Sequence, residues 1–470
     1  MNSHLLGRAA TGGEIAREGL GYQDMYVLSR LPEWLSQGAF SGVISECIGD
    51  VEVCYFTVRG QRRTFIEAKN YKLTPKKFWA EIREFQKVHT GNERVYTHFL
   101  YVAPELPTDL SPIFRQLQRI RNHGASFDPG ASPLVAAEAD FVQSVVDAGE
   151  TPGLARFVLE HVDFDLFDDT QAESRCLGAL PNALPPFDEF ASGKQKAVLA
   201  KWKELVTSST KRRIDRREFE QAILDSLAEA EAKYWLNYPT TIHLQKGAQG
   251  EKTPSPFDIS INVAPFLGED RGARTPQEWA ELTVAVEGMG EFIRNSRPRN
   301  LIQVGAELRM SLATVLGVSL KAAKGHHLEI VHRDTIFPLH RFDKAPIAYF
   351  SREECTGSGH NGIVLIHIGA ATRNDLKEVM DQHTLSAAPR LYLESASPIP
   401  DIATLNTAVA EAKSALATFR SNEQIHLLHV FIKGPSFFAM ALGHRLNALG
   451  EVQLYDWVGS AYLPTARVLT

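Results

Sequence analysis

The sequence contains little cysteine and no long apolar segment, and both absences narrow the kinds of protein that it can encode. Its 470 residues include four cysteines, none of them in a Cys-x-x-Cys pair, so we expect neither a disulfide framework nor a cysteine zinc site. No stretch reaches the roughly 20 apolar residues that span a bilayer, and the first residues lack the basic and apolar regions of a signal peptide. We therefore expect a cytoplasmic protein that does not enter a membrane.

Two common enzyme signatures and a strong net charge are also missing. Without a Walker A motif or a nucleophile elbow, the sequence does not indicate P-loop nucleotide hydrolysis or α/β-hydrolase chemistry. The net charge of -6 argues against a uniformly basic surface. Two runs are nonetheless basic: residues 58–87 hold nine Lys or Arg against three acids, and residues 194–217 hold nine against two. Each run is either a solvated charged face or a surface for phosphate groups.

The length and the 44% hydrophobic content predict two or three domains, and the helices and strands described next predict the α/β class. Apolar spacing predicts a helix over 14–37, in which Pro32 can cause a break or a kink, and then two strands around a turn over 49–71. A helix that begins after Thr74 and a buried strand over 96–106 follow. Residues 130–235 are expected to be mostly helical or irregular. A change of composition over 237–258 marks a domain boundary, which we place between residues 235 and 236.

The two strands of 49–71, GDVEVCYFTVRGQRRTFIEAKNY, carry charged residues that can meet. Asp50 stands at the start of the first strand, and Glu67 and Lys69 project from the same side of the second. Two carboxylates can hold Mg²⁺ or Mn²⁺ for phosphodiester hydrolysis, while a lysine positions the water or neutralises developing charge. A salt-bridge ladder on an edge strand is the alternative. Glu46 and Gln23 are further candidates, as a nearby carboxylate and as a polar contact from the first helix.

An internal repeat occupies the second half of the sequence. Residues 300–334 and 425–458 each read as strand, turn, helix and strand, which predicts right-handed βαβ units and parallel sheets. We expect two Rossmann-like halves, in which small residues let each helix lie close to its sheet. The shared helical motif consists of Ala313, Leu316, Gly317 and Leu320 in the first copy and Ala439, Leu442, Gly443 and Leu446 in the second.

Motifs at both ends of the sequence resemble one known family. GLGYQDMYVLSRLPEWL, ECIGDVEVCYF and TFIEAKNYKLTPKKFWAEIREF resemble the N-terminal PD-(D/E)xK double-strand DNA endonuclease of CBASS anti-phage effectors. LLHVFIKGPSFFAMALGHRLNALGEVQLYDWVGSAYLPT resembles the closing part of their SAVED sensor domain. The resemblance implies a nuclease domain over 1–235, with a core of about 10–125 and a helical extension, and a SAVED domain of two fused CARF-like halves over 236–470.

The resemblance also implies a function. A cyclic oligonucleotide, expected to be a cyclic trinucleotide, would bind the SAVED domain, promote self-association and license the nuclease to degrade double-stranded DNA in the bacterial cytoplasm. Two rival interpretations stay open. One is a stand-alone restriction-type nuclease with a C-terminal dimerisation module, and the other is a non-catalytic binder of nucleotide signals.

Candidate ligand contacts lie where strands pass into helices in the repeat. In the second copy, Lys433 supplies charge, Gly434 and Pro435 form the turn, and Ser436 and the first N–H groups of the helix can donate to phosphate. A purely structural Gly-Pro turn is the alternative. The first copy has Glu307 and Arg309 at the matching positions, so the two halves are not equivalent; these two side chains could instead pair with each other. Thr372 and Arg373 form a third candidate wall.

Overall fold

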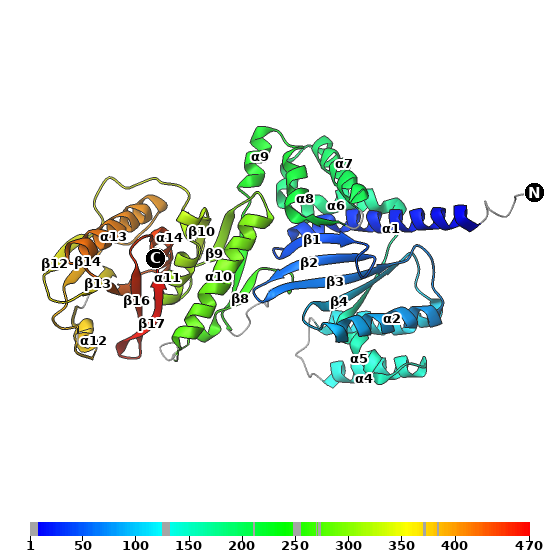
Figure 1. Cartoon of the computed structure of the whole chain (residues 1–470), viewed down its shortest axis with the longest axis horizontal. Helices are drawn as coiled ribbons and strands as arrows, with labels where there is room; N and C mark the ends of the chain where they lie inside the picture. Colours follow the sequence, from blue (N-terminus) through cyan, green and yellow to red (C-terminus); the bar gives the residue numbers. More distant parts are fainter. Residues whose placement is uncertain are drawn as a thin grey trace, which may run out of the picture. The chain divides into compact units, whose positions relative to one another are not determined.

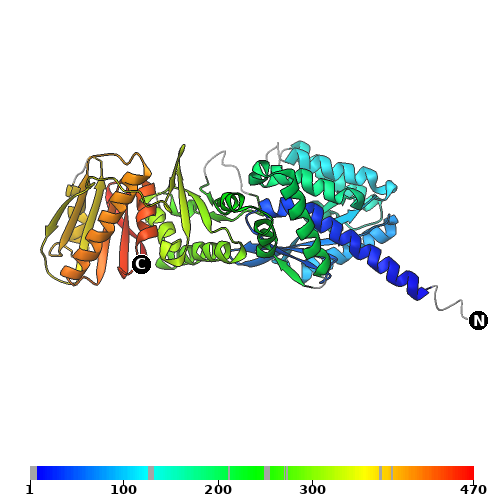
Figure 2. The ribbon, with the colours of Figure 1, turned by 90° about the horizontal axis from the view of Figure 1, so that it is seen from above.

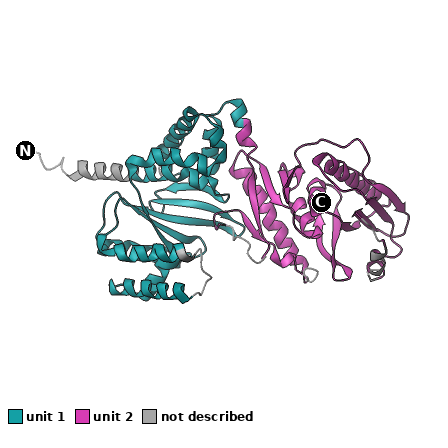
Figure 3. Cartoon of the chain, turned by 180° about the vertical axis from the view of Figure 1, so that it is seen from behind, with its two compact units in different colours: residues 1–232 teal, residues 233–470 magenta. Residues whose placement is uncertain are grey.

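The chain divides into two compact units, residues 1–232 and 233–470 (Figure 3). The division falls inside helix α9 (Glu229–Leu236), close to the boundary predicted between 235 and 236. The computed structural model describes residues 8–124, 132–209, 212–247, 255–268, 270, 274–369, 373–382 and 385–470. Within these ranges, none of the helices has the length and apolar character needed to cross a membrane.

The first unit is built on a mixed sheet with strand order β5-β4-β3-β2-β1-β6. Its strands are β1 (Phe40–Ser45), β2 (Val51–Thr57), β3 (Gly60–Ala68), β4 (Tyr96–Ala103), β5 (Val162–Leu166) and β6 (Arg213–Asp215). The predicted hairpin is confirmed as β2 and β3, which pair antiparallel, and the predicted buried strand is β4. The short strands β5 and β6 were not predicted, because they lie in the segment expected to be helical or irregular.

Helices cover both faces of this sheet (Figure 1). They are α1 (Arg8–Ser36), α2 (Pro75–Gly91), α3 (Ser111–Gly124), α4 (Ser132–Asp147), α5 (Pro152–His161), α6 (Ala172–Ala183), α7 (Ser192–Ser208) and α8 (Arg216–Leu224). Helices α1, α6, α7 and α8 lie on one side, and α2, α4 and α5 lie on the other. The predicted start of α2 is confirmed, since the Thr74 side chain accepts a hydrogen bond from the Lys77 N–H.

Helix α1 continues through Pro32, so the expected break is absent. A proline inside a helix removes one hydrogen bond and crowds the preceding turn. Leu31 and Leu35 flank the proline and are both buried in the core, at 0% and 1% exposure. Burial of these side chains offsets the local cost and keeps the last turn helical.

The second unit contains two sheets. The first has the order β11-β10-β9-β7-β8 and the second has the order β12-β14-β13-β15-β16-β17. Their strands are β7 (Thr240–Gln245), β8 (Ser260–Asn262), β9 (Leu301–Gly305), β10 (His327–His332), β11 (Thr335–Pro338), β12 (Ser351–Cys355), β13 (Asn361–Ile368), β14 (Arg390–Ser395), β15 (Leu427–Lys433), β16 (Glu451–Val458) and β17 (Ala461–Leu469).

The two predicted βαβ units are confirmed. Strands β9 and β10 pair in parallel with α11 (Met310–Ser319) between them, and β15 and β16 pair in parallel with α14 (Ser436–Arg445) between them. The unit also contains α10 (Pro276–Ser296), α12 (Lys377–Gln382) and α13 (Ile402–Asn422). Helix α13, in orange, lies along one face of the second sheet (Figure 2).

The glycines of the repeated motif have a different role from the expected one. A Cβ atom on Gly317 would lie 2.1 Å from the carbonyl oxygen of Met440, and one on Gly443 would lie 2.4 Å from that of Thr314. Helices α11 and α14 therefore pack against each other at these glycines, so the expectation that they set each helix on its own sheet was wrong. The motif instead joins the two halves of the unit.

Candidate active site and sensor residues

Asp50, Glu67 and Lys69 meet at the ends of the neighbouring strands β2 and β3, in the interior of the first unit's sheet. The Lys69 ammonium contacts the Glu67 carboxylate and donates to Asp50 Oδ2 at 3.4 Å. Asp50 Oδ2 also accepts a hydrogen bond from the Ala68 N–H at 2.9 Å. The convergence that the spacing predicted is confirmed, while the catalytic role of the three residues stays a prediction.

The strand register explains this convergence. Val51 pairs with Ile66 across the β2–β3 hairpin, which places Asp50 opposite the end of β3 where Glu67 lies. The Lys69 N–H donates to the Val102 carbonyl at 2.9 Å, so the β3–β4 pairing continues one residue past the end of β3. Since side chains alternate along extended backbone, Lys69 stays on the same face as Glu67.

The three side chains are mostly buried, with exposures of 21% for Asp50, 15% for Glu67 and 20% for Lys69. Burial, and then the negative charge of Asp50, raise the pKa of Glu67. Burial also disfavours the Lys69 ammonium, but its hydrogen bond to Glu67 and the two carboxylate charges outweigh this and raise the pKa of Lys69. Two acids thus share one ammonium group, and a negative charge is left to be balanced.

This donor set fits a divalent cation such as Mg²⁺, because both acids are hard oxygen ligands and carry unbalanced charge. Asp50 and Glu67 would hold the ion, which when bound would polarise a phosphodiester and activate a water molecule. No cluster of three or more His, Cys, Asp or Glu suited to a metal occurs in the described part of the chain. Water, main-chain or phosphate oxygens would therefore complete the coordination, as is usual for Mg²⁺.

The two additional candidates, Gln23 and Glu46, differ in what the structure shows of them. Gln23 is buried on α1 at 9% exposure, and its side-chain oxygen has no hydrogen-bond partner among the described residues. The backbone N–H of Glu46 donates to the Asp50 carbonyl at 2.9 Å and closes the turn before β2. No hydrogen bond between described residues joins either side chain to the three central residues, so their roles stay predictions.

Sequence reasoning missed Asp24, the neighbour of Gln23. Burial, and then the charge of Glu46, raise the pKa of Asp24 to about 6. Asp24 and Glu46 therefore form a second pair of acids, one from α1 and one from the turn before β2. In the sequence, the position of Asp24 next to the candidate Gln23 was the available signal. A single aspartate on a helix is too common to indicate a site.

Both basic runs are largely paired with acids. Most basic residues of 194–217 are engaged with acids of the same unit or its boundary helix: Lys194 with Glu231, Lys201 with Asp225, Lys203 with Glu173, Arg212 with Glu218, Arg213 with Asp215 and Arg216 with Glu220. Lys211 lies outside the described residues. In the other run, Lys76 and Lys77 are exposed at the start of α2, shortly after Lys69. Five other basic residues of this run pair with acids: Arg63, Lys69, Lys72, Arg83 and Lys87. Ion pairing therefore does not decide which run contacts phosphate.

In the second half of the sensor unit, the predicted contacts surround the start of α14. Lys433 is exposed at the end of β15, and Pro435 is the N-cap residue of α14, where no side chain caps the helix. Gly434 packs against Ile368, whose Cβ lies 3.1 Å from the position that a Cβ on the glycine would take. The Ser436 hydroxyl is buried and donates to the Ala306 carbonyl of the other half.

The first half has a different arrangement at the matching positions. Glu307 pairs with Lys246 at 3.3 Å, and Arg309 Nε donates to the Leu267 carbonyl at 3.4 Å, so the alternative Glu307–Arg309 pair is not what the structure contains. The buried Asp456 of β16 accepts a hydrogen bond from the Ser311 N–H at 3.0 Å. An internal carboxylate thus occupies the start of α11, whereas the start of α14 has no such cap.

Arg373, from the third candidate wall, is engaged at the end of the second sheet. It forms ion pairs with Glu353 at 2.7 Å and with Glu394 at 2.6 Å, and its guanidinium lies 4.3 Å from the centre of the Tyr392 ring. Thr372 lies outside the described residues.

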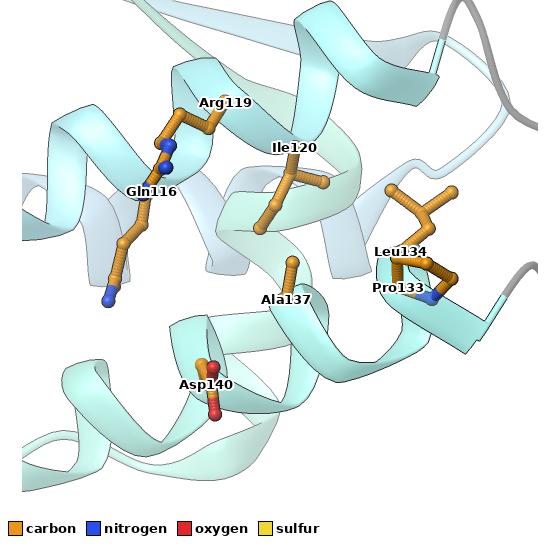
Figure 4. Close-up of a pocket in the computed structure, with 7 residues that line it drawn as sticks. All are labelled: Gln116, Arg119, Ile120, Pro133, Leu134, Ala137 and Asp140. Carbon is orange, nitrogen blue, oxygen red and sulfur yellow. The ribbon is translucent and has the colours of Figure 1, made fainter.

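A pocket of about 360 Å³ lies between α3 and α4, away from all of these residues (Figure 4). It is lined by Gln116, Arg119, Ile120, Pro133, Leu134, Ala137 and Asp140. None of them was predicted as a site residue, and none belongs to the Asp50 centre.

Comparison with known proteins gives matches in both units and over the whole chain. Residues 11–99 match the family "Cap4, dsDNA endonuclease domain", and residues 287–468 match the "SMODS-associated and fused to various effectors sensor domain", SAVED. The CD-NTase-associated protein 4 of Moraxella osloensis is 36% identical over 100% of both chains, and that of an Acinetobacter species is 35% identical over 100% of both.

Solved structures agree with these matches. The Acinetobacter baumannii Cap4 SAVED/CARF-domain containing receptor, solved with the cyclic trinucleotide 2'3'3'-cAAA, is 34% identical and covers 96% of this chain and 99% of its own, with a TM-score of 0.86. The Moraxella osloensis receptor is 35% identical and covers 96% and 100%, with a TM-score of 0.82. The chain therefore belongs to the CD-NTase-associated protein 4 family and is a nuclease that joins a Cap4 double-stranded DNA endonuclease domain to a SAVED sensor domain.

Proposed function

We propose that this chain is a CBASS anti-phage effector whose nuclease cuts double-stranded DNA after a cyclic oligonucleotide binds the SAVED domain. The observation that carries the catalytic part is the contact of one ammonium group, that of Lys69, with both the Asp50 and the Glu67 carboxylates. Support for the sensing part comes from the likeness, over nearly the whole chain, to a receptor solved with a cyclic trinucleotide.

The chemistry at the nuclease centre is metal-dependent hydrolysis of a phosphodiester bond. Asp50 and Glu67 would hold Mg²⁺ or Mn²⁺, which when bound would supply positive charge at the scissile phosphate and at a water molecule. Without a bound ion, the hydrogen bond to Glu67 and the two carboxylate charges outweigh burial and raise the pKa of Lys69. Its ammonium orients the attacking water or offsets the negative charge that develops on the phosphate.

The ligand that we propose is a cyclic trinucleotide with its phosphates near the start of α14. Lys433 is exposed there, and the helix start has no side-chain cap, so its N–H groups can donate to an anion. Ser436 contributes its backbone N–H, because its hydroxyl already bonds to Ala306. Four other residues remain candidate ligand contacts: Glu307, Arg309, Thr372 and Arg373. To contact the ligand, Arg373 would have to break its ion pairs with Glu353 and Glu394.

Cleavage should depend little on DNA sequence. Contacts from lysine and arginine to phosphate carry no base information, and the exposed Lys76 and Lys77 at the start of α2 are candidates to make them. Such binding weakens steeply as salt rises. Mapped cut ends that share a long, strict sequence would contradict this part of the proposal.

A ligand screen tests the proposed function. Purified protein is incubated with plasmid DNA and magnesium, without ligand and with a panel of cyclic di- and trinucleotides. Degradation that requires one cyclic trinucleotide is the expected result. Equal cleavage without ligand would favour a stand-alone restriction-type nuclease, and no cleavage with any ligand or metal would favour a non-catalytic binder.

A further inference from the structure

Glu52 is a second acid on the strand that follows Asp50, and the proposed chemistry does not use it. It lies two residues after Asp50 in β2, so both side chains project from the same face of the sheet. Its side chain is fully buried, with 0% exposure. A buried carboxylate is costly unless donors surround it, so its presence beside the nuclease centre requires a physical reason.

Donors from three places satisfy the Glu52 carboxylate. Its Oε1 accepts a hydrogen bond from the Ile48 backbone N–H at 3.0 Å. Its Oε2 accepts from Arg63 Nη1 at 2.7 Å and from the Tyr96 hydroxyl at 3.2 Å. Hydrogen bonds to a charged acceptor are stronger than neutral ones, so this network fixes the position of the Glu52 carboxylate and of the Ile48 backbone that bonds to it.

The group held through Ile48 is the turn that carries Asp50. The turn closes through the Glu46 N–H, which donates to the Asp50 carbonyl at 2.9 Å, and Glu46 adopts a left-handed backbone with φ of 53°. Gly49 lies against Phe65, where a Cβ would be 2.7 Å from the ring. The Ile48 side chain is 62% exposed, so the middle of the turn is fixed by its backbone bond to Glu52 and not by burial of Ile48.

We infer that Glu52 is a positioning residue for the metal-binding carboxylate of Asp50. It fixes the backbone of the turn at Ile48 while Arg63 and Tyr96 fix Glu52 itself, so Asp50 presents its carboxylate in one direction. This inference rests on the proposed role of Asp50 as a metal ligand. It also assigns Arg63, a member of the first basic run, to the support of the centre and not to DNA.

Glu220 supplies a matched control for the experiment. It too is fully buried at 0% exposure in the first unit, and it pairs with Arg216 at 2.8 Å, but it lies on helix α8 and not on the strand that follows the turn. Replacing either glutamate removes a buried charge beside an arginine, so both changes should destabilise the unit. Only the change at Glu52 should alter the nuclease centre.

Two quantities are measured on the full chain without DNA. One is the affinity for Mn²⁺, detected by electron paramagnetic resonance, and the other is the melting temperature. Glu52→Ala should weaken Mn²⁺ binding by about 10-fold or more, as expected when a residue that orients a metal ligand is lost. Glu52→Gln should weaken it less, because the amide oxygen still accepts from Ile48. Glu220→Ala and Glu220→Gln should lower the melting temperature and leave Mn²⁺ binding unchanged.

Asp50→Ala distinguishes the metal-binding role of Asp50 from the positioning role of Glu52. If Asp50→Ala leaves Mn²⁺ binding unchanged, the proposed centre is wrong and the inference about Glu52 falls with it. If Asp50→Ala weakens binding but folded Glu52→Ala or Glu52→Gln protein binds Mn²⁺ as wild type does, only the positioning role is overturned. Equal weakening by the Glu220 variants would reduce the Glu52 effect to general destabilisation.

Discussion

The candidate residues of the nuclease centre and those of the sensor domain differ in the partners to which they bond. Asp50, Glu67 and Lys69 come from one hairpin and its ends, and they bond mainly to one another. The sensor candidates come from distant parts of the chain, and most bond to groups that hold the fold together, as Ser436 does with Ala306. The nuclease site can therefore be recognised from a short stretch of sequence. The sensor candidates at strand and helix ends cannot, because the same residues also stabilise the fold.

The two copies of the repeat also differ in whether a structural bond occupies the position where a ligand could bind. Both copies place a helix after a parallel strand. Asp456 accepts from Ser311 at the start of α11, whereas among the described residues no side chain is seen to cap α14. A carboxylate at a helix start satisfies the N–H groups that would otherwise attract an anion. The ligand phosphates are therefore expected at the α14 end, which makes the two halves unequal in recognition.

The largest effect is expected at the nuclease centre. Lys69→Ala should lower DNA cleavage by at least about 100-fold, because it removes the charge that both carboxylates share. Ligand affinity should stay near the wild-type value, since the ligand binds the other unit. Cleavage assays and ligand titrations measure the two quantities.

Lys413→Ala is the control for this change. Lys413 closes a second Glu-Ala-Lys sequence, on helix α13, and should be neutral for cleavage. If Lys69→Ala still cuts at the normal rate, the assignment of the centre is wrong.

The strongest sequence predictions were those that rest on short-range geometry. The side-chain alternation placed Glu67 and Lys69 together, and Thr74 was found as the cap of α2, because both follow from neighbouring residues. The βαβ repeats were also predicted, since their strands, turns and helices recur in one order.

Other features depend on contacts that the sequence does not display. Strand β5 joins the sheet through β4, far along the chain, and Gly317 meets α14 of the other half. Glu52 was overlooked for a similar reason: its alternation with Asp50 was visible, but its burial against Ile48, Arg63 and Tyr96 was not.

Ligand affinity should be the next most sensitive property. Lys433→Ala should weaken cyclic trinucleotide binding by about 10- to 100-fold, because a hydrogen bond to a charged group contributes about 1.5–3 kcal/mol. Self-association should weaken in parallel if the two equilibria are linked. Lys324→Ala, which removes an exposed lysine paired with Glu287, is the control and should leave affinity unchanged. A Lys433→Ala protein with wild-type affinity would remove this residue from the ligand site.

Stability should respond to the glycines that join the two halves. Gly317→Ala would place a methyl group 2.1 Å from the Met440 carbonyl oxygen, which has little freedom to move. We expect a loss of about 1–3 kcal/mol in the free energy of unfolding. Gly288→Ala on α10 is the control, because a Cβ there meets nothing within 4 Å, and alanine should stabilise the helix by about 1 kcal/mol. Equal effects of both changes would contradict close packing at Gly317.

Acid should lower the stability of the folded chain through His444. Burial lowers the pKa of His444 from 6.5 to about 4, so the unfolded chain binds a proton before the folded chain does. The folded state should therefore lose stability as pH falls from 6.5 to 4, by about 2 kcal/mol at pH 5 for this residue. Unfolding measured at pH 7 and pH 5 tests this, and His444→Gln should lose less stability between the two. An identical pH dependence in the variant would exclude His444 as a source of acid sensitivity.

The most direct test of ligand-controlled cleavage follows particle size and DNA degradation in the same samples. Light scattering and plasmid cleavage are measured with magnesium over a range of concentrations of the activating cyclic trinucleotide. We predict that wild-type protein is small and inactive without ligand, and that size and cleavage rise over the same ligand range. Full cleavage without ligand would contradict ligand control, and cleavage that rises while the size stays constant would contradict control by assembly.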